Sequence, residues 1–132
     1  MEKEARWKLR FENFEKALDS LKEVMEQKDL DNEIIIDASI QRFEVTFELA
    51  WKTLQDYLFE VGIIEFKGPK NIIAKAYQDN IIEDGQTWVD MHKDRNVLTH
   101  EYAFMESRAI FQRIKTSYIQ AFIQFQRRLQ DE

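Results

Sequence analysis

The sequence predicts an all-α protein: a single domain over residues 1–132, built as an up-and-down bundle of four or five helices. Two observations support this prediction. Gly (3) and Pro (1) are scarce, which disfavours a turn-rich all-β fold. Hydrophobic residues make up 44% of the chain, and most of them recur at alternating steps of three and four, the spacing of one helix face.

The first two helices are the longest predicted elements. The first spans residues 3–28, and a polar loop at 27–33 follows it. The second helix begins with Asp37 as its N-cap and ends at Gly62. Its apolar residues cover more than one face, which indicates a central helix or one that also contacts a second subunit. The residues that lie off its main stripe are Val45, Leu49, Trp51 and Leu58.

Three further helices follow. Pro69 favours the first turn of a short helix that ends at Asn80. A fourth helix begins near Asp84 or Gln86, and the last one spans residues 106–129. The apolar residues of this last helix also cover more than one face. We therefore expect a homodimer, the alternative being that both broad apolar faces are buried within one subunit. The residues predicted to point inward on the short helix are Ile72, Ile73, Ala76 and Tyr77.

Composition limits the classes of function. The chain has no cysteine, which excludes disulfides, thiolate metal sites and a cysteine nucleophile. No apolar run is long enough for a membrane span and no signal-peptide core is visible, so a soluble, cytoplasmic protein is expected. The net charge of −6 argues against a protein that coats nucleic acid non-specifically. The acidity is concentrated in residues 1–84, since residues 85–132 hold 7 Lys and Arg against 6 Asp and Glu.

Reactive side chains concentrate in residues 94–102, which contain Arg95, Asn96, His100 and Tyr102. Arginine is a fixed cation whose planar fork matches phosphate oxygens, and histidine transfers protons near pH 7. This combination suggests phosphate chemistry. In a regular helix Arg95 and His100 would lie roughly 140° apart. They converge only if the helix bends or ends between them, or if each meets its counterpart across a symmetric interface.

Other candidate residues have plainer interpretations. His92 shares a helix face with Arg95 and is either a second site residue or, as we prefer at this point, a surface histidine beside Trp88. Asp90 and Asp94 are interpreted as solvated helix charges, and no metal site and no cofactor are predicted. The tryptophans are expected in the core rather than as stacking platforms for bases. These are Trp7, Trp51 and Trp88.

The stretch from Arg95 to Tyr102 resembles the R-x4-H-x-Y motif of HEPN-domain proteins of the HepT type, also described as nucleotidyltransferase substrate-binding proteins. Segments 42–54, 68–70 and 88–96 are similar to family segments in the same order. The resemblance extends from about residue 5 to residue 125. Taken together, these segments are more specific than the R-x4-H spacing alone.

The resemblance implies a dimeric toxin that is a metal-independent endo- or exoribonuclease, with two motifs facing each other across a cleft. His100 would transfer protons, Arg95 would stabilise the phosphate, and Asn96 would bind phosphate or orient the histidine. A cognate nucleotidyltransferase antitoxin would neutralise the toxin by transferring AMP to Tyr102, in a hetero-oligomer of the two proteins.

Two alternatives use the same fold. One is a non-catalytic substrate-binding subunit of a small nucleotidyltransferase, which presents a substrate and cleaves nothing. The other is a plain helical dimerisation module, against which the intact motif argues.

Overall fold

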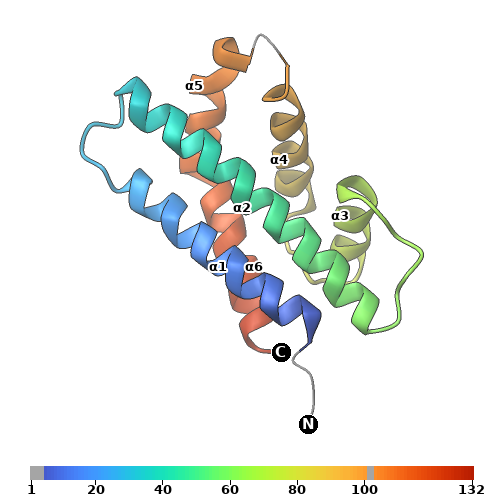
Figure 1. The fold of residues 1–132 in the computed structure, drawn as a ribbon. Coiled ribbons are helices and arrows are strands. Elements are labelled where there is room, and N and C mark those ends of the chain that lie inside the picture. Colours follow the sequence, from blue (N-terminus) through green and yellow to red (C-terminus); the bar gives the residue numbers. More distant parts are fainter. Residues whose placement is uncertain (1–4, 101–102) are drawn as a thin grey trace.

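The computed structural model describes residues 5–100 and 103–132, and these ranges contain only helices and their connections. Figure 1 shows α1 (Arg6–Met25) and α2 (Glu33–Glu60) running side by side in opposite directions. The short α3 (Pro69–Gln78) and α4 (Gly85–Val97) follow α2. The final helix consists of α5 (Ala103–Arg113), a π-helical turn η1 (Ile114–Tyr118) and α6 (Ile119–Gln130). The prediction of an all-α bundle is confirmed.

The start of α2 differs from the prediction. The helix begins at Glu33, and Asn32 is its N-cap: the Asn32 side chain accepts a hydrogen bond from the Ile34 N–H at 2.8 Å. Asp37 therefore lies inside the helix and does not cap it. The reason is that Asn32 already satisfies a free backbone donor of the first turn, so the helix starts before the chain reaches Asp37.

The predicted stop at Gly62 is confirmed. Gly62 has φ +96°, a conformation that favours glycine, and the Ile63 N–H donates to the Leu58 carbonyl at 2.9 Å. The first helix is shorter than predicted. It ends at Met25, and the backbone N–H of the C-cap residue Glu26 donates to carbonyls of the last turn. The last helix begins at Ala103 instead of residue 106.

The short helix α3 begins at Pro69 as predicted but ends at Gln78, because Asn80 adopts a positive φ of 61°. The prediction that Tyr77 points inward is wrong, since 53% of the residue is exposed. Its ring covers Gly85 at the start of α4, where an added Cβ would lie 2.8 Å from the ring. Tyr77 thus joins the surfaces of α3 and α4.

The core contains most of the residues predicted to be buried. Trp7 and Trp88 are buried as expected, whereas Trp51 is only partly buried at the edge of the core. Leu58 and Phe122, which belong to the broad apolar faces, are also buried within this subunit. Burial inside one subunit therefore accounts for part of the apolar surface that suggested a dimer. In the described part of the chain, no helix has the length and apolarity that crossing a bilayer requires.

Candidate functional site

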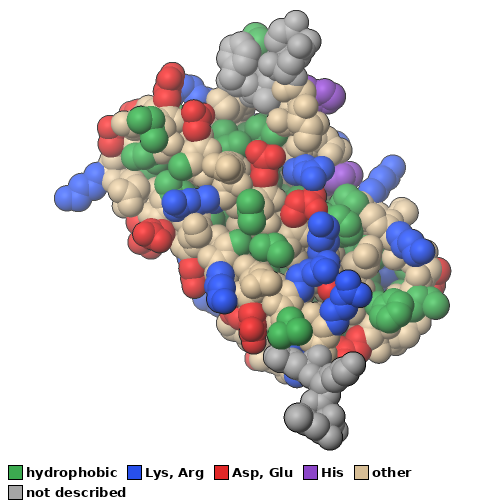
Figure 2. All heavy atoms as spheres, viewed as in Figure 1, with side chains coloured by type: hydrophobic (Ala, Val, Ile, Leu, Met, Phe, Trp, Pro, Cys, Tyr) green, Lys and Arg blue, Asp and Glu red, His purple; other side chains and the backbone are tan. Residues whose placement is uncertain are grey.

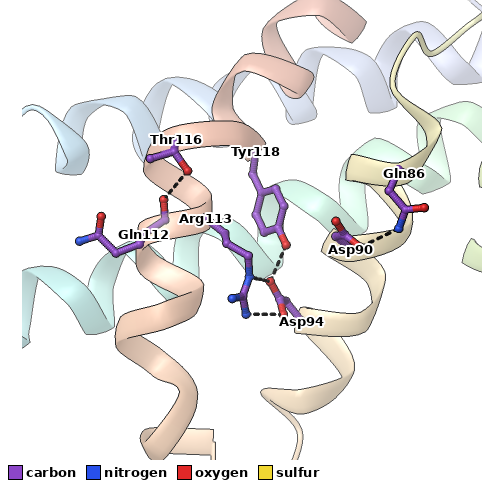
Figure 3. A network of polar contacts seen from close by, with 7 residues as sticks. All are labelled: Gln86, Asp90, Asp94, Gln112, Arg113, Thr116 and Tyr118. Atoms are coloured by element: carbon purple, nitrogen blue, oxygen red, sulfur yellow. Dashed lines mark hydrogen bonds and ion pairs between the residues drawn. The ribbon is translucent and has the colours of Figure 1, made fainter.

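The end of α4 is anchored to the final helix through Asp94 (Figure 3). Arg113 donates two hydrogen bonds to the Asp94 carboxylate, at 2.7 and 2.8 Å. The Tyr118 hydroxyl donates a third, at 2.5 Å. Asp94 is 8% exposed, so its interpretation as a solvated charge was wrong. Trp88, Met91 and Asp94 are all buried and three residues apart, a spacing that puts Asp94 on the inner face of α4.

The two partners of Asp94 lie at the two ends of the π-helical turn. Arg113 precedes this turn and Tyr118 ends it, and Figure 3 shows both side chains pointing toward α4. Burial and the hydrogen bond to Asp94 raise the pKa of Tyr118, so its hydroxyl stays protonated and donates. The hydrogen bond to Asp94 raises the pKa of Arg113, which remains a cation. These contacts fix the end of α4, where the candidate site residues begin.

Arg95 directly follows this anchor and reaches toward α2. Its Nη2 lies 2.5 Å from Oε1 of Glu48, and the side chain remains 32% exposed. Glu48 also pairs with Lys52, at 3.4 Å. One turn earlier on α2, burial raises the pKa of Glu44, and the nearby Arg95 opposes that rise. The guanidinium is therefore held at the surface by a carboxylate, the kind of oxyanion that arginine also binds in a phosphate.

His92 and Asn96 lie next to Arg95. The Asn96 Nδ2 is 3.5 Å from Nε2 of His92, and the His92 ring stacks on Phe47 with the centroids 6.3 Å apart. Burial is the main cause that lowers the pKa of His92, and Arg95 lowers it further. His92 is thus half-buried on Phe47 in one group with Arg95, a placement that favours the site-residue interpretation over the surface one.

His100 lies beyond the end of α4. The helix ends at Val97, and the His100 N–H donates to the Val97 carbonyl at 3.0 Å. His100 itself is exposed. The helix therefore ends between Arg95 and His100, which is the condition under which the two side chains can converge. Among the described residues, no hydrogen bond or ion pair joins them. Tyr102 lies outside the described residues.

The charges around Arg95 are balanced, since Glu48 pairs with it and Glu44 lies nearby. Figure 2 shows basic and acidic side chains interleaved over α2 on the face that carries the site. Within residues 5–100 and 103–132, no three His, Cys, Asp or Glu side chains gather in a way that would hold a metal ion. The arrangement offers a positioned guanidinium, an amide and two histidines. Groups of these types can bind an anion and transfer protons.

Sequence reasoning missed Glu48 as the partner of Arg95. The signal was weak, because Glu48 lies 47 positions before Arg95, and only the packing of α2 against α4 brings the two side chains together.

Comparisons with known proteins agree with this fold. Residues 9–131 match the family model of nucleotidyltransferase substrate binding protein like proteins. A crystal structure of a protein from Thermus thermophilus is 38% identical, with a TM-score of 0.78, over 88% of this chain and 98% of the other.

A second solved structure is HI0074 from Haemophilus influenzae, described as having the fold of a substrate binding domain of a nucleotidyltransferase. It is 22% identical, with a TM-score of 0.63, over 94% of this chain and 96% of that one, and it supports the fold. No sequence among the curated proteins matches. On the family match and its coverage, the chain belongs to the nucleotidyltransferase substrate binding protein like family.

Proposed function

We propose that this protein is the toxin of a toxin–antitoxin pair: a metal-independent ribonuclease that uses Arg95, Asn96 and His100. The observation that carries the proposal is the end of α4 at Val97. It frees His100 from the helical repeat that would otherwise hold it on a different face from Arg95. His100 is exposed and Arg95 is partly exposed, so both are open to a polymeric substrate.

The reaction we propose uses the nucleophile that RNA carries. The 2′-oxygen attacks the adjacent phosphorus, a histidine takes the 2′-hydroxyl proton, and the P–O5′ bond breaks. A second acid protonates the leaving 5′-oxygen. Arg95 stabilises the charge on the phosphate oxygens, once the phosphate displaces Glu48 from the guanidinium. General acid–base catalysis of this kind contributes typically ~10²–10⁴-fold.

This chemistry favours a homodimer. The reaction uses a base and an acid on opposite sides of the phosphate, whereas one chain supplies one exposed histidine, His100, because His92 stacks half-buried on Phe47. Two motifs facing each other across a symmetric cleft provide both. Val45, which is 51% exposed on α2, is one of the apolar residues that a second subunit would cover.

The partner we propose is a small nucleotidyltransferase, in keeping with the family of the chain. It would neutralise the toxin by transferring AMP to Tyr102. The attached group adds bulk and a negative charge two residues from His100, and that charge repels the RNA backbone. A Tyr102→Phe variant should therefore escape neutralisation when the partner is present. Full neutralisation of that variant would exclude this route.

The experiment that tests the proposal is growth after induced expression without a partner. We expect the wild type to arrest growth, and Arg95→Ala and His100→Ala to grow normally, with cleavage of total RNA reduced at least ~10²-fold. Arg127→Ala is the matched control, because Arg127 is an exposed arginine on α6, a helix that carries none of the proposed site residues. It should arrest growth like the wild type.

The second candidate function is the non-catalytic substrate-binding subunit, and the family match favours it as much as the first. It predicts that all four proteins, soluble and folded, leave growth unchanged. It also predicts that a nucleotidyltransferase co-purifies with the wild type and with His100→Ala alike. That pair of results would replace the ribonuclease proposal.

A further inference from the structure

A pocket of about 270 Å³ lies between α3 and α4, on the side of His92. Lys70 and Ile73 line it from α3, and Val89, His92 and Lys93 line it from α4. The spacings of three and four residues place each group on one face of its helix. The pocket is thus built by two helices, and its wall combines basic and apolar side chains.

The charge in this pocket is positive. Lys70 and Lys93 supply two ammonium groups, and neither forms an ion pair with any residue that the structure describes. Arg95 and Lys70 both lower the pKa of His92, after burial, so the ring sits in a positive field. The carboxylate that counteracts this field at His92 is Glu48 of α2, and it is already paired with Arg95. An anion entering the pocket would therefore find cations that lack a partner.

The remaining wall is suited to a flat apolar group. Ile73 is 2% exposed and forms the floor, and Val89 is 39% exposed at the side. The His92 ring completes this wall and stacks on Phe47 behind it. An anion next to an apolar slot is the chemistry of a nucleotide, with a phosphate for the lysines and a base for the aliphatic side chains.

His92 also connects the pocket to the candidate site. It lines the pocket on one side, and its Nε2 lies 3.5 Å from Nδ2 of Asn96 on the other. Arg95 is three residues from His92 on the same helix and close enough to lower the pKa of His92, so the pocket lies beside the guanidinium.

We propose that the α3–α4 pocket is a nucleotide subsite for single-stranded RNA. Lys70 and Lys93 hold a backbone phosphate beside the one that Arg95 binds, and the apolar wall contacts a base. The subsite rests on the proposed function for its choice of RNA, but its lysines bind substrate whether or not the chain is cut.

The test is direct binding of a fluorescent pentanucleotide in which 2′-H replaces each 2′-OH, so that no nucleophile is present. Anisotropy is measured from about 50 to about 200 mM salt, the range over which phosphate contacts dominate the salt dependence, for the full-length wild type, Lys70→Gln, Lys93→Gln and the double variant. Lys16→Gln is the control, since Lys16 is exposed on α1 and its loss changes the net charge equally. Circular dichroism verifies that each variant is folded.

The plot of log K against log salt has a negative slope, and we expect each lysine removed to make that slope less steep by ~0.7. Each removal should also lower the affinity at 0.1 M salt about fivefold. The double variant should lose about 25-fold, on the same counterion-release arithmetic. Lys16→Gln should bind like the wild type. Unchanged affinity and slope in the double variant would overturn the subsite.

Two further outcomes separate this proposal from the ribonuclease. A wild type that binds through Lys70 and Lys93 but neither cleaves RNA nor arrests growth would retain the subsite and exclude the ribonuclease. A double variant that binds the oligonucleotide normally but no longer co-purifies with the nucleotidyltransferase would make this face a protein interface, and the subsite would be wrong.

Discussion

Replacing Asp94 with alanine tests whether the buried network anchors α4. The substitution removes the acceptor of three hydrogen bonds, from Arg113 at 2.7 and 2.8 Å and from the Tyr118 hydroxyl at 2.5 Å. Tyr118 is 1% exposed, so its hydroxyl would remain buried without this partner. The Arg113 side chain is 43% exposed and can turn to water.

The magnitude follows from that difference in exposure. Breaking a fully buried ion pair costs ~3–5 kcal/mol. Arg113 can hydrogen-bond to water instead, so losing its ion pair costs little free energy. The remaining cost is the buried Tyr118 hydroxyl without a partner, at ~1–3 kcal/mol, together with the lost packing of the Asp94 side chain. We expect Asp94→Ala to lower the free energy of unfolding by about 2–3 kcal/mol on this basis. Tyr118→Phe removes only one of the three bonds, and a loss of about 1 kcal/mol is expected.

Urea denaturation followed by circular dichroism and by tryptophan fluorescence measures both variants. Trp88 is a suitable reporter because it is buried on α4, six residues before Asp94. In a double-mutant cycle, Tyr118→Phe should cost much less in the Asp94→Ala background than alone. A free energy of unfolding within about 0.5 kcal/mol of the wild type for Asp94→Ala, the range of an ordinary surface substitution, would refute the anchoring role.

Two other predictions concern stability. Gly85→Ala places a Cβ 2.8 Å from the Tyr77 ring, so a loss of about 1–2 kcal/mol in urea is expected, and Tyr77→Ala in the same chain should remove the clash. The second follows from His92, whose pKa is lowered by burial and by the cations Arg95 and Lys70. The unfolded state then binds more protons just below the ordinary histidine pKa of about 6.5, so stability should fall as pH decreases through that region. His92→Gln should fall less steeply over the same window, and parallel pH curves for the two proteins would contradict the assignment.

The fold was largely predictable because it depends on local patterns. Stripes at steps of three and four located the helices, and Gly62 and Pro69 marked two of their ends. The errors lie at helix ends and turns, where several polar residues of similar type could each serve as the cap. Asn32 and Asp37 are both acceptable N-caps by type, and only the backbone shows that Asn32 is used. The π-helical turn at Ile114–Tyr118 has no apolar pattern of its own and was not visible in the sequence.

The candidate site was open to sequence analysis in part. Residue types and the family resemblance indicate Arg95, Asn96 and His100 as candidates, and their role stays a prediction. The helix does end between Arg95 and His100, as their convergence requires. The surroundings of the site were not predictable, because they depend on side chains that are distant in the sequence. Lys70 comes from α3 and Glu48 from α2, and each contributes only through the packing of those helices against α4.

The acidity of the chain is compatible with binding RNA, because salt screens the charges that lie far from the candidate site. At 0.1 M ionic strength charges more than about 10 Å apart are largely screened, so the net −6 matters less than the groups that surround the site. In the function that we propose, Glu48 neutralises Arg95 until a phosphate competes for the guanidinium. A polyanion held by Lys70 and Lys93 would compete effectively, whereas a lone chloride or carboxylate would not. An ion pair as exposed as Arg95–Glu48 contributes at most about 1 kcal/mol, so a phosphate already held by the two lysines would need little further free energy to displace the carboxylate.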